Sequence, residues 1–142
     1  MKARKKVLAS VLITVQSVQT HIRSVMDACI QPELRTVLQE QLHELDDIET
    51  ETHRMAFQRG WELNELDPFL RFWMDRKIRI KITGRHKDSR IAGLMIQCNT
   101  DSMIRSLRKL KQAALEDETL KILFQKLLDC ERAHIRLLQN YL

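Results

Sequence analysis

The 142-residue chain has the length of one ordinary domain, and folding at this size buries about two-thirds of the unfolded surface. Three Gly and two Pro are too few for the turns of a many-stranded β fold, and 44% hydrophobic residues exclude a disordered composition. The net charge of +5 comes from one segment, because Asp67 to Arg90 holds eight Lys/Arg against three Asp while the rest is balanced. The charge therefore indicates one basic patch rather than a generally cationic protein.

Two amphipathic helices are predicted in the first 60 residues. The first runs from about Ala3 to Cys29, and the second begins at Pro32, a residue tolerated in the first helical turn, and ends at Gly60. The inward line of the first is Val7, Val11, Val15, Val18, Ile22, Val25 and Cys29; that of the second is Leu34, Leu38, Leu45, Ile48, Thr52 and Ala56. Because the joint is short, the two helices should pack antiparallel.

A long crossover is predicted over about residues 61–87, where the helical period fades. Residues 77–83 (Lys-Ile-Arg-Ile-Lys-Ile-Thr) alternate strictly, which in isolation predicts a strand. Since one strand has no partner in this chain, we expect either a ribbon paired between subunits or an extended stretch across the bundle. Phe69, Phe72 and Trp73 are spaced like a short helix whose aromatic face covers the end of the bundle.

A third helix is predicted from Ser89 to about Leu115, with Asp88 or Ser89 as its N-cap. Its inward line is Ala92, Ile96, Asn99, Met103, Leu107, Leu110 and Ala114. A second apolar group lies on a different flank and must be covered by the crossover or by another subunit. This group is the predicted oligomer interface and consists of Ile91, Leu94, Met95 and Cys98.

Asp117 is the predicted cap of a fourth helix that reaches the C-terminus. Its inward stripe is Leu120, Phe124, Leu127, Glu131, His134, Leu138 and Tyr141. The order of hairpin, long connection and hairpin predicts an all-α four-helix bundle, one domain over residues 1–142, in which helices two and three run parallel.

The cysteines bear on the compartment. Cys29, Cys98 and Cys130 are odd in number, far apart and without a CxxC pair, so neither a disulfide framework nor a zinc knuckle is indicated. We therefore expect a reducing, cytoplasmic location. The basic start and the apolar residues 7–15 imitate a secretory signal, but the stripe continues unbroken to Cys29, as a helix of the folded domain requires. No apolar run approaches the ~20 residues of a membrane span, so no membrane partner is expected.

The strongest chemical signal is Glu131 and His134, because a Glu-x-x-His facing the interior is what a di-iron or di-manganese centre takes from one helix. A complete centre needs more inward acids than the other helices offer. Glu49 and His53 come nearest on helix two, but their spacing is four rather than three. We therefore expect Glu131 and His134 to be hydrogen-bonded to each other, with no cofactor; bound Fe or Mn is the alternative.

The crossover carries the ingredients of a surface that binds a phosphate backbone or a single strand. Its basic residues beside Phe72 and Trp73 are Arg71, Arg76, Lys77, Arg79 and Lys81. They interleave poorly with the aromatic residues, and no nucleic-acid motif accompanies them. Nine Asp/Glu from Glu33 to Glu65 offer an acidic face in the same molecule or in a neighbour, so binding of nucleic acid is the less favoured interpretation.

Several short runs resemble the spore coat F-like family of Gram-positive bacteria, which is similar in turn to ferritin-like bundles. They are Pro-Glu-Leu-Arg at 32–35, Leu38, Gln-Leu at 41–42 and above all Gln-Arg-Gly-Trp at 58–61, with a looser likeness over 88–110 and 127–142. The resemblance implies a ferritin-like four-helix bundle, a role in or near the spore coat and no established catalysis. The chain departs from it in its long basic crossover, and at Gly93 and Asn99, where relatives that hold metal would carry acids.

The sequence as a whole favours a non-enzymatic structural or assembly protein. It should form a homo-oligomer, a dimer or larger, through the outer face of helix three and the crossover, and reside in the cytoplasm or in the spore. Two alternatives stay open, namely a metal-binding ferritin-like protein and a polyanion-binding protein.

Overall fold

The computed structural model describes residues 2–113 and 116–142, and the described residues form helices and no strand. The elements are α1 (Lys2–Met26), α2 (Pro32–Gln58), α3 (Pro68–Lys81), α4 (Lys87–Ala113), α5 (Glu118–Leu138) and the 3-10 turn η1 (Gln139–Tyr141). The predicted all-α fold is confirmed. Ala114 and Leu115, expected at the end of helix three, lie outside the described residues.

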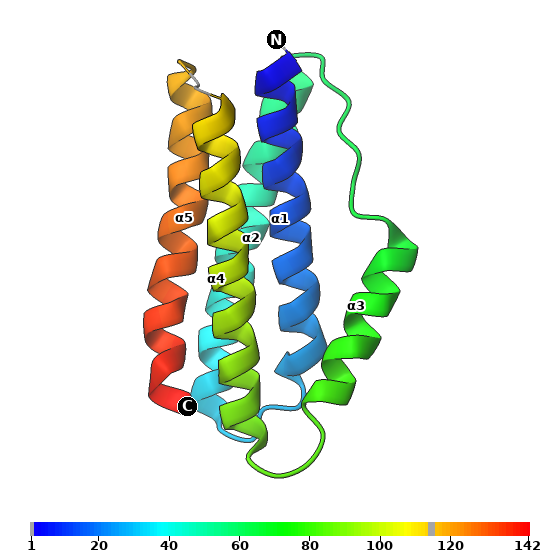
Figure 1. Ribbon diagram of the computed structural model, residues 1–142, viewed down its shortest axis with the longest axis vertical. Coiled ribbons are helices and arrows are strands. Elements are labelled where there is room, and N and C mark those ends of the chain that lie inside the picture. The colour runs from blue at the N-terminus through cyan, green and yellow to red at the C-terminus, as the bar shows by residue number, and fades with distance from the viewer. Residues whose placement is uncertain (1, 114–115) are drawn as a thin grey trace.

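Four long helices pack side by side, and α3 lies outside them against α1 (Figure 1). Around the group, α1 contacts α2 and α4, and α5 contacts the same two helices. The helices α2 and α4 run parallel, as the long crossover predicts, while each neighbouring pair is antiparallel (Figure 1). This arrangement places α3 and α5 on opposite sides of the molecule.

The inward stripes of α1, α2 and α5 are where the helical period puts them. Every residue named for the first two stripes is buried, and on α5 only Tyr141, in η1, is half-buried. The predicted line of α4 is confirmed only in part: Ala92 and Asn99 are buried, whereas Ile96, Met103, Leu107 and Leu110 are half-buried at the edge of the core. The buried residues of α4 are Asp88, Ile91, Ala92, Met95, Asn99, Ser102 and Ser106. Two serines lie inward, so the buried side of this helix is rotated from the line that apolar spacing predicts.

The predicted strand over residues 77–83 is wrong, because most of this segment continues the helix α3. Asp67 caps that helix by accepting a hydrogen bond from the Phe69 amide at 2.9 Å, and Pro68 begins it. Ile78 and Ile82 stand four residues apart and are buried, while Ile80 between them is 71% exposed. A helix satisfies its own backbone hydrogen bonds, whereas a lone strand would leave them open.

The predicted oligomer interface is largely inside the chain. Ile91 and Met95 are 0% exposed in the core, so they have no surface to offer a second subunit. Leu94 and Cys98 are half-buried and line a small cavity together with Ile78 and other residues of α3. The crossover therefore covers this flank, which is one of the two covers expected for it.

The C-terminal end of α2 and the start of α5 have the caps that the sequence predicts. Gly60 has a positive φ of 68°, and the Gly60 and Trp61 amides donate back to the Phe57 and Ala56 carbonyls at 3.2 and 2.9 Å. This is the left-handed helix end that the glycine predicts. Asp117 caps α5 as predicted, by accepting from the Leu120 amide.

No helix among the described residues is long and apolar enough to cross a membrane.

Asp88 does not act as the predicted cap of α4 but holds the loop between α1 and α2. Its two carboxylate oxygens accept from the Ile30 and Gln31 amides, each at 2.8 Å. We expect Asp88→Ala to lower the free energy of unfolding by about 2 kcal/mol, because both amides lose a charged acceptor. Urea unfolding measures this, with Asp67→Ala, an exposed cap, as the milder control. Equal losses in the two variants would contradict the assignment.

Candidate metal centre and the outward face of α3

The centre of the helix group contains polar side chains rather than a continuous apolar core. Glu131 and His134 of α5 are 0% and 2% exposed, as their place on the inward stripe predicts. The hydrogen bond expected between Glu131 and His134 is not formed within the described part of the chain. Glu131 Oε1 instead accepts from the Ser102 hydroxyl at 2.7 Å, and Gln41 Nε2 donates to Asn99 Oδ1 at 2.9 Å.

Several buried atoms of this cluster have no hydrogen-bond partner in the structure: both ring nitrogens of His134, Glu131 Oε2, Gln41 Oε1 and Asn99 Nδ2. Leaving a buried polar group unpaired costs about 1–3 kcal/mol. Burial raises the pKa of Glu131 to about 7, partly opposed by Ser102 and Arg105. Burial also lowers the pKa of His134, against the opposing charges of Glu44 and Glu40. Near neutral pH His134 is therefore mainly uncharged.

The structure does not bring Glu49 and His53 to Glu131 and His134. Glu49 Oε2 accepts from Gln16 Nε2 of α1 at 3.0 Å. His53 Nε2 lies 3.5 Å from Glu65 Oε1 in the segment after α2. Both residues therefore face α1 and the crossover, and the predicted four-residue metal site is not assembled.

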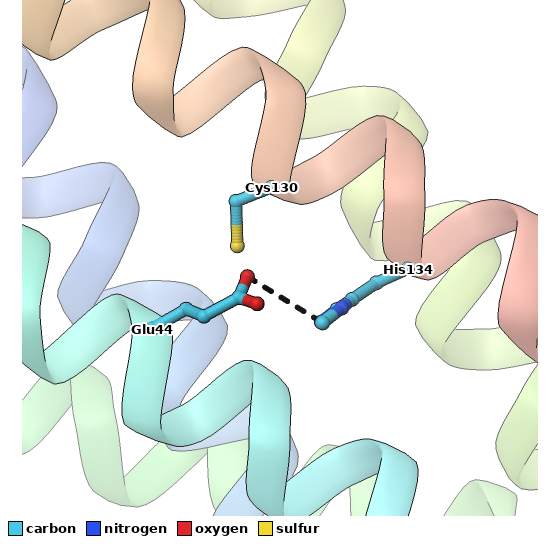
Figure 2. A group of neighbouring side chains, drawn as sticks. All are labelled: Glu44, Cys130 and His134. Carbon is cyan, nitrogen blue, oxygen red and sulfur yellow. Dashed lines mark ion pairs between the residues drawn. The ribbon is translucent and has the colours of Figure 1, made fainter.

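A different set of ligands meets at His134. Cys130 and His134, one turn apart on α5, point toward Glu44 of α2 (Figure 2). The Glu44 Oε2 and His134 Nε2 atoms are 3.7 Å apart, and one ligand atom from each of the three residues lies within 4.8 Å of the others. Cys130 is 6% exposed, whereas the Glu44 side chain is 52% exposed. The three residues form a site that is buried on one side and open to solvent on the other.

The charge at this site favours a protonated thiol when no cation is present. Burial raises the pKa of Cys130, and hydrogen bonding to Glu44 together with the charges of Glu44 and Glu131 raises it further. Cys130 followed four residues later by His134 is a helical ligand spacing that the sequence does contain. Glu44 could not be found in this way, because its place opposite α5 depends on how the two helices are rotated and aligned.

A groove of about 400 Å³ runs along the surface between α2 and α5 at the same level. Three acids line it, Glu44, Asp47 and Asp129, with Lys126 as the only base. Its apolar lining is Ile48, Cys130 and Ala133. The groove therefore combines negative charge with a small apolar surface.

The outward side of α3 carries bulky apolar residues, contrary to the expectation that they cover the end of the bundle. Phe69, Phe72, Trp73 and Ile80 are 69%, 50%, 56% and 71% exposed. They follow each other at helical spacing, opposite the buried Ile78. The Trp73 ring packs edge-on against both phenylalanines at 6.1 Å, and the Arg76 guanidinium lies 5.2 Å from the Phe72 ring centre. α3 thus presents a second apolar stripe that is half exposed or more at each of these residues.

The same helix carries five Lys/Arg against one Asp. That acid, Asp75, accepts a hydrogen bond from the Ser24 hydroxyl of α1 at 2.6 Å, and this contact joins α3 to α1. Asp75 also accepts from Arg79 of its own helix at 2.9 Å. Within the described parts of the chain no salt bridge joins the other four bases, Arg71, Arg76, Lys77 and Lys81, to an acid. The acidic face of α2 is therefore not paired with this basic helix inside one molecule.

Comparison of the chain with protein-family models, with curated proteins and with solved structures gave no significant match.

Proposed function

We propose that this chain is a non-enzymatic assembly protein with a ferritin-like four-helix bundle, in which α3 of one copy binds the acidic groove between α2 and α5 of a second copy. The observation that carries this proposal is the exposed stripe of Phe69, Phe72, Trp73 and Ile80 on a basic helix. Helices with apolar anchors at such spacing bind in grooves of partner proteins. A place in or near the spore coat belongs to the same proposal and rests on the resemblance of residues 58–61.

Complementary charge favours a second copy of the chain as the partner of α3. α2 has seven Asp/Glu against two Arg, and the groove adds Asp129 of α5. Two α3 helices facing each other would bring their bases together, which is unfavourable. An aromatic side chain such as Trp73 can lie on the apolar lining of the groove while Arg76 faces Asp47 or Asp129. The second copy therefore supplies both the apolar contact and the charge that α3 lacks.

The contact is head to tail, because α3 lies on the opposite side of the molecule from α5 (Figure 1), and the groove is formed by α5 and α2. Such contacts form rings or open chains rather than a closed two-fold dimer. Fully burying one large apolar side chain contributes about 1.5–3 kcal/mol, and the four on α3 are already partly covered. Association costs at least about 4 kcal/mol, so we expect weak, salt-sensitive and concentration-dependent assembly.

Mixing two variants tests the head-to-tail contact. Trp73→Ala removes an apolar anchor of α3, and Asp47→Lys combined with Asp129→Lys reverses the charge of the groove. Each variant alone should be a monomer in light scattering after size exclusion, whereas the wild type should form dimers and larger species. The mixture should restore a dimer and nothing larger, because each variant keeps one intact half of the contact.

The matched control is Ile30→Ala, which removes an apolar side chain that is 74% exposed and belongs to neither surface. It should assemble like the wild type. A monomeric wild type at high concentration, or a mixture of the two variants that stays monomeric, would overturn the proposal. If the wild type instead binds a labelled single-stranded oligonucleotide, with affinity that falls steeply with salt and is lost in Arg76→Glu, α3 is a polyanion-binding surface.

A further inference from the structure

We infer that Glu44, Cys130 and His134 form a binding site for one zinc-class divalent transition-metal ion. The site differs from the two-metal carboxylate centre considered from the sequence, because it includes a thiol and excludes Glu131, Glu49 and His53. Its ligands all come from one chain, so binding does not require assembly, although Glu44 and Cys130 also line the groove that the proposed assembly uses.

The ligand set matches the chemistry of zinc. A thiolate, an imidazole and a carboxylate are its usual protein ligands, and the thiolate disfavours Mn²⁺ and Mg²⁺. Zinc–ligand bonds of about 2.0–2.3 Å place tetrahedral ligand atoms about 3.3–3.8 Å apart. Glu44 Oε2 and His134 Nε2 are 3.7 Å apart, and all three ligand atoms lie within 4.8 Å of one another. Small side-chain movements would therefore complete three corners of a tetrahedron.

The His134 ring is buried without hydrogen-bond partners, which independently points to a bound cation. This ring is 2% exposed, and neither of its nitrogens has a hydrogen-bond partner. A cation at Nε2 would supply one partner. Metal-binding histidines usually donate their other ring N–H to an acceptor, and the buried cluster holds two acceptors without partners, Gln41 Oε1 and Glu131 Oε2. A metal ion would thus satisfy a group whose burial is otherwise unfavourable.

Binding needs no redox partner. The metal–sulfur bond forms as the Cys130 S–H bond breaks, and the proton leaves to solvent, while Glu44 binds as a carboxylate and His134 as the neutral ring. The fourth corner faces the open side of the site, beside the exposed Glu44, and takes a water molecule or a fourth ligand from solvent.

Cobalt(II), which replaces zinc and is coloured, is the probe for this site. Titration of the wild type should give a thiolate-to-cobalt charge-transfer band in the near ultraviolet, one equivalent at saturation, and added Zn²⁺ should abolish it. Cys130→Ser should lose the band, whereas Cys98→Ser and Cys29→Ser should keep it. Proton release in weak buffer should accompany the wild-type titration and be absent from Cys130→Ser.

Glu44→Gln provides a test that does not disturb the core, because this side chain is half exposed. It should weaken cobalt binding at least about tenfold, while Glu40→Gln, an exposed acid one turn away, should not. Trp73→Ala should bind cobalt like the wild type, so a failure of the assembly proposal leaves this test intact. Absence of the band in the wild type, or its survival in Cys130→Ser, would overturn the inference.

Discussion

Glu131→Gln is expected to stabilise the metal-free protein by about 3 kcal/mol at pH 8. Glu131 is 0% exposed, and burial raises its pKa to about 7 from the ordinary value of 4.5. Above pH 7 the folded protein therefore holds a buried carboxylate with one hydrogen bond, from Ser102. Glutamine keeps the acceptor for Ser102 and removes the charge.

The sign of the pH dependence follows from the raised pKa. Below about pH 4.5 Glu131 is protonated in both the folded and the unfolded states, so the charge has no effect on stability. Between pH 4.5 and 7 the unfolded chain loses this proton first, and the wild type becomes less stable as the pH rises. By about pH 8 the folded state has lost the proton too, and the loss is nearly complete and constant. The advantage of Glu131→Gln should thus be small at pH 4.5 and full at pH 8.

Urea unfolding at a series of pH values, in the presence of a chelator, measures this difference. Glu40→Gln is the matched control, because it removes an exposed carboxylate from the neighbouring helix α2. Its difference from the wild type should be small and nearly independent of pH. If Glu131→Gln were less stable than the wild type at pH 8, the buried carboxylate would have partners that the structure does not contain.

Ile78→Ala is expected to release α3 from α1, at a local cost of about 3 kcal/mol. Ile78 is the buried residue of this helix, Ile82 at its C-cap is also buried, and Ser24 of α1 donates a hydrogen bond to Asp75. Because α3 packs mainly on α1 alone, the loss should appear as local opening rather than as global unfolding.

Hydrogen exchange followed by mass spectrometry measures this opening. Amides within residues 69–81 should exchange roughly a hundredfold faster, since 1.4 kcal/mol corresponds to a factor of ten, while those of α5 should be unchanged. Ile80→Ala is the matched control: it removes the same side chain two residues away, where it is 71% exposed, and should have little effect. Equal effects at the two positions would contradict the helix and favour the strand expected from their alternation.

A free α3 should also change the assembly. The apolar stripe and the bases act together only while the helix is ordered, so Ile78→Ala should weaken the head-to-tail contact even though Ile78 belongs to neither half of it. The cobalt site should remain, because Glu44, Cys130 and His134 come from α2 and α5. The two properties can therefore be separated experimentally.

Much of the fold follows from local patterns. The aliphatic lines of α1 and α2 and the stripe of α5 repeat at helical spacing, and they are buried as expected because one side of each helix faces the others. Gly60 ends α2 because glycine adopts a positive φ, and Asp117 begins α5 because its side chain accepts a hydrogen bond from the Leu120 amide. Glu131 and His134 lie inward by the same periodicity.

Other features depended on contacts between distant parts of the chain. Residues 77–83 satisfy both the alternating and the helical pattern, and packing of Ile78 and Ile82 on α1 decides between them. Polar residues such as Ser102 lie on the inward side of α4 because they meet Glu131 across the helix pair, which hydrophobicity alone cannot indicate.

The sequence by itself determined the four long helices, their approximate ends and the inward direction of three of them, since these depend on spacing within one segment. Only the tertiary structure decided which side chains meet between segments: that Glu44 rather than Glu49 lies beside His134, and that Leu94 and Cys98 line a cavity together with residues of α3. The physical reason is that the rotation and alignment of one helix against another are set by the packing of the whole core.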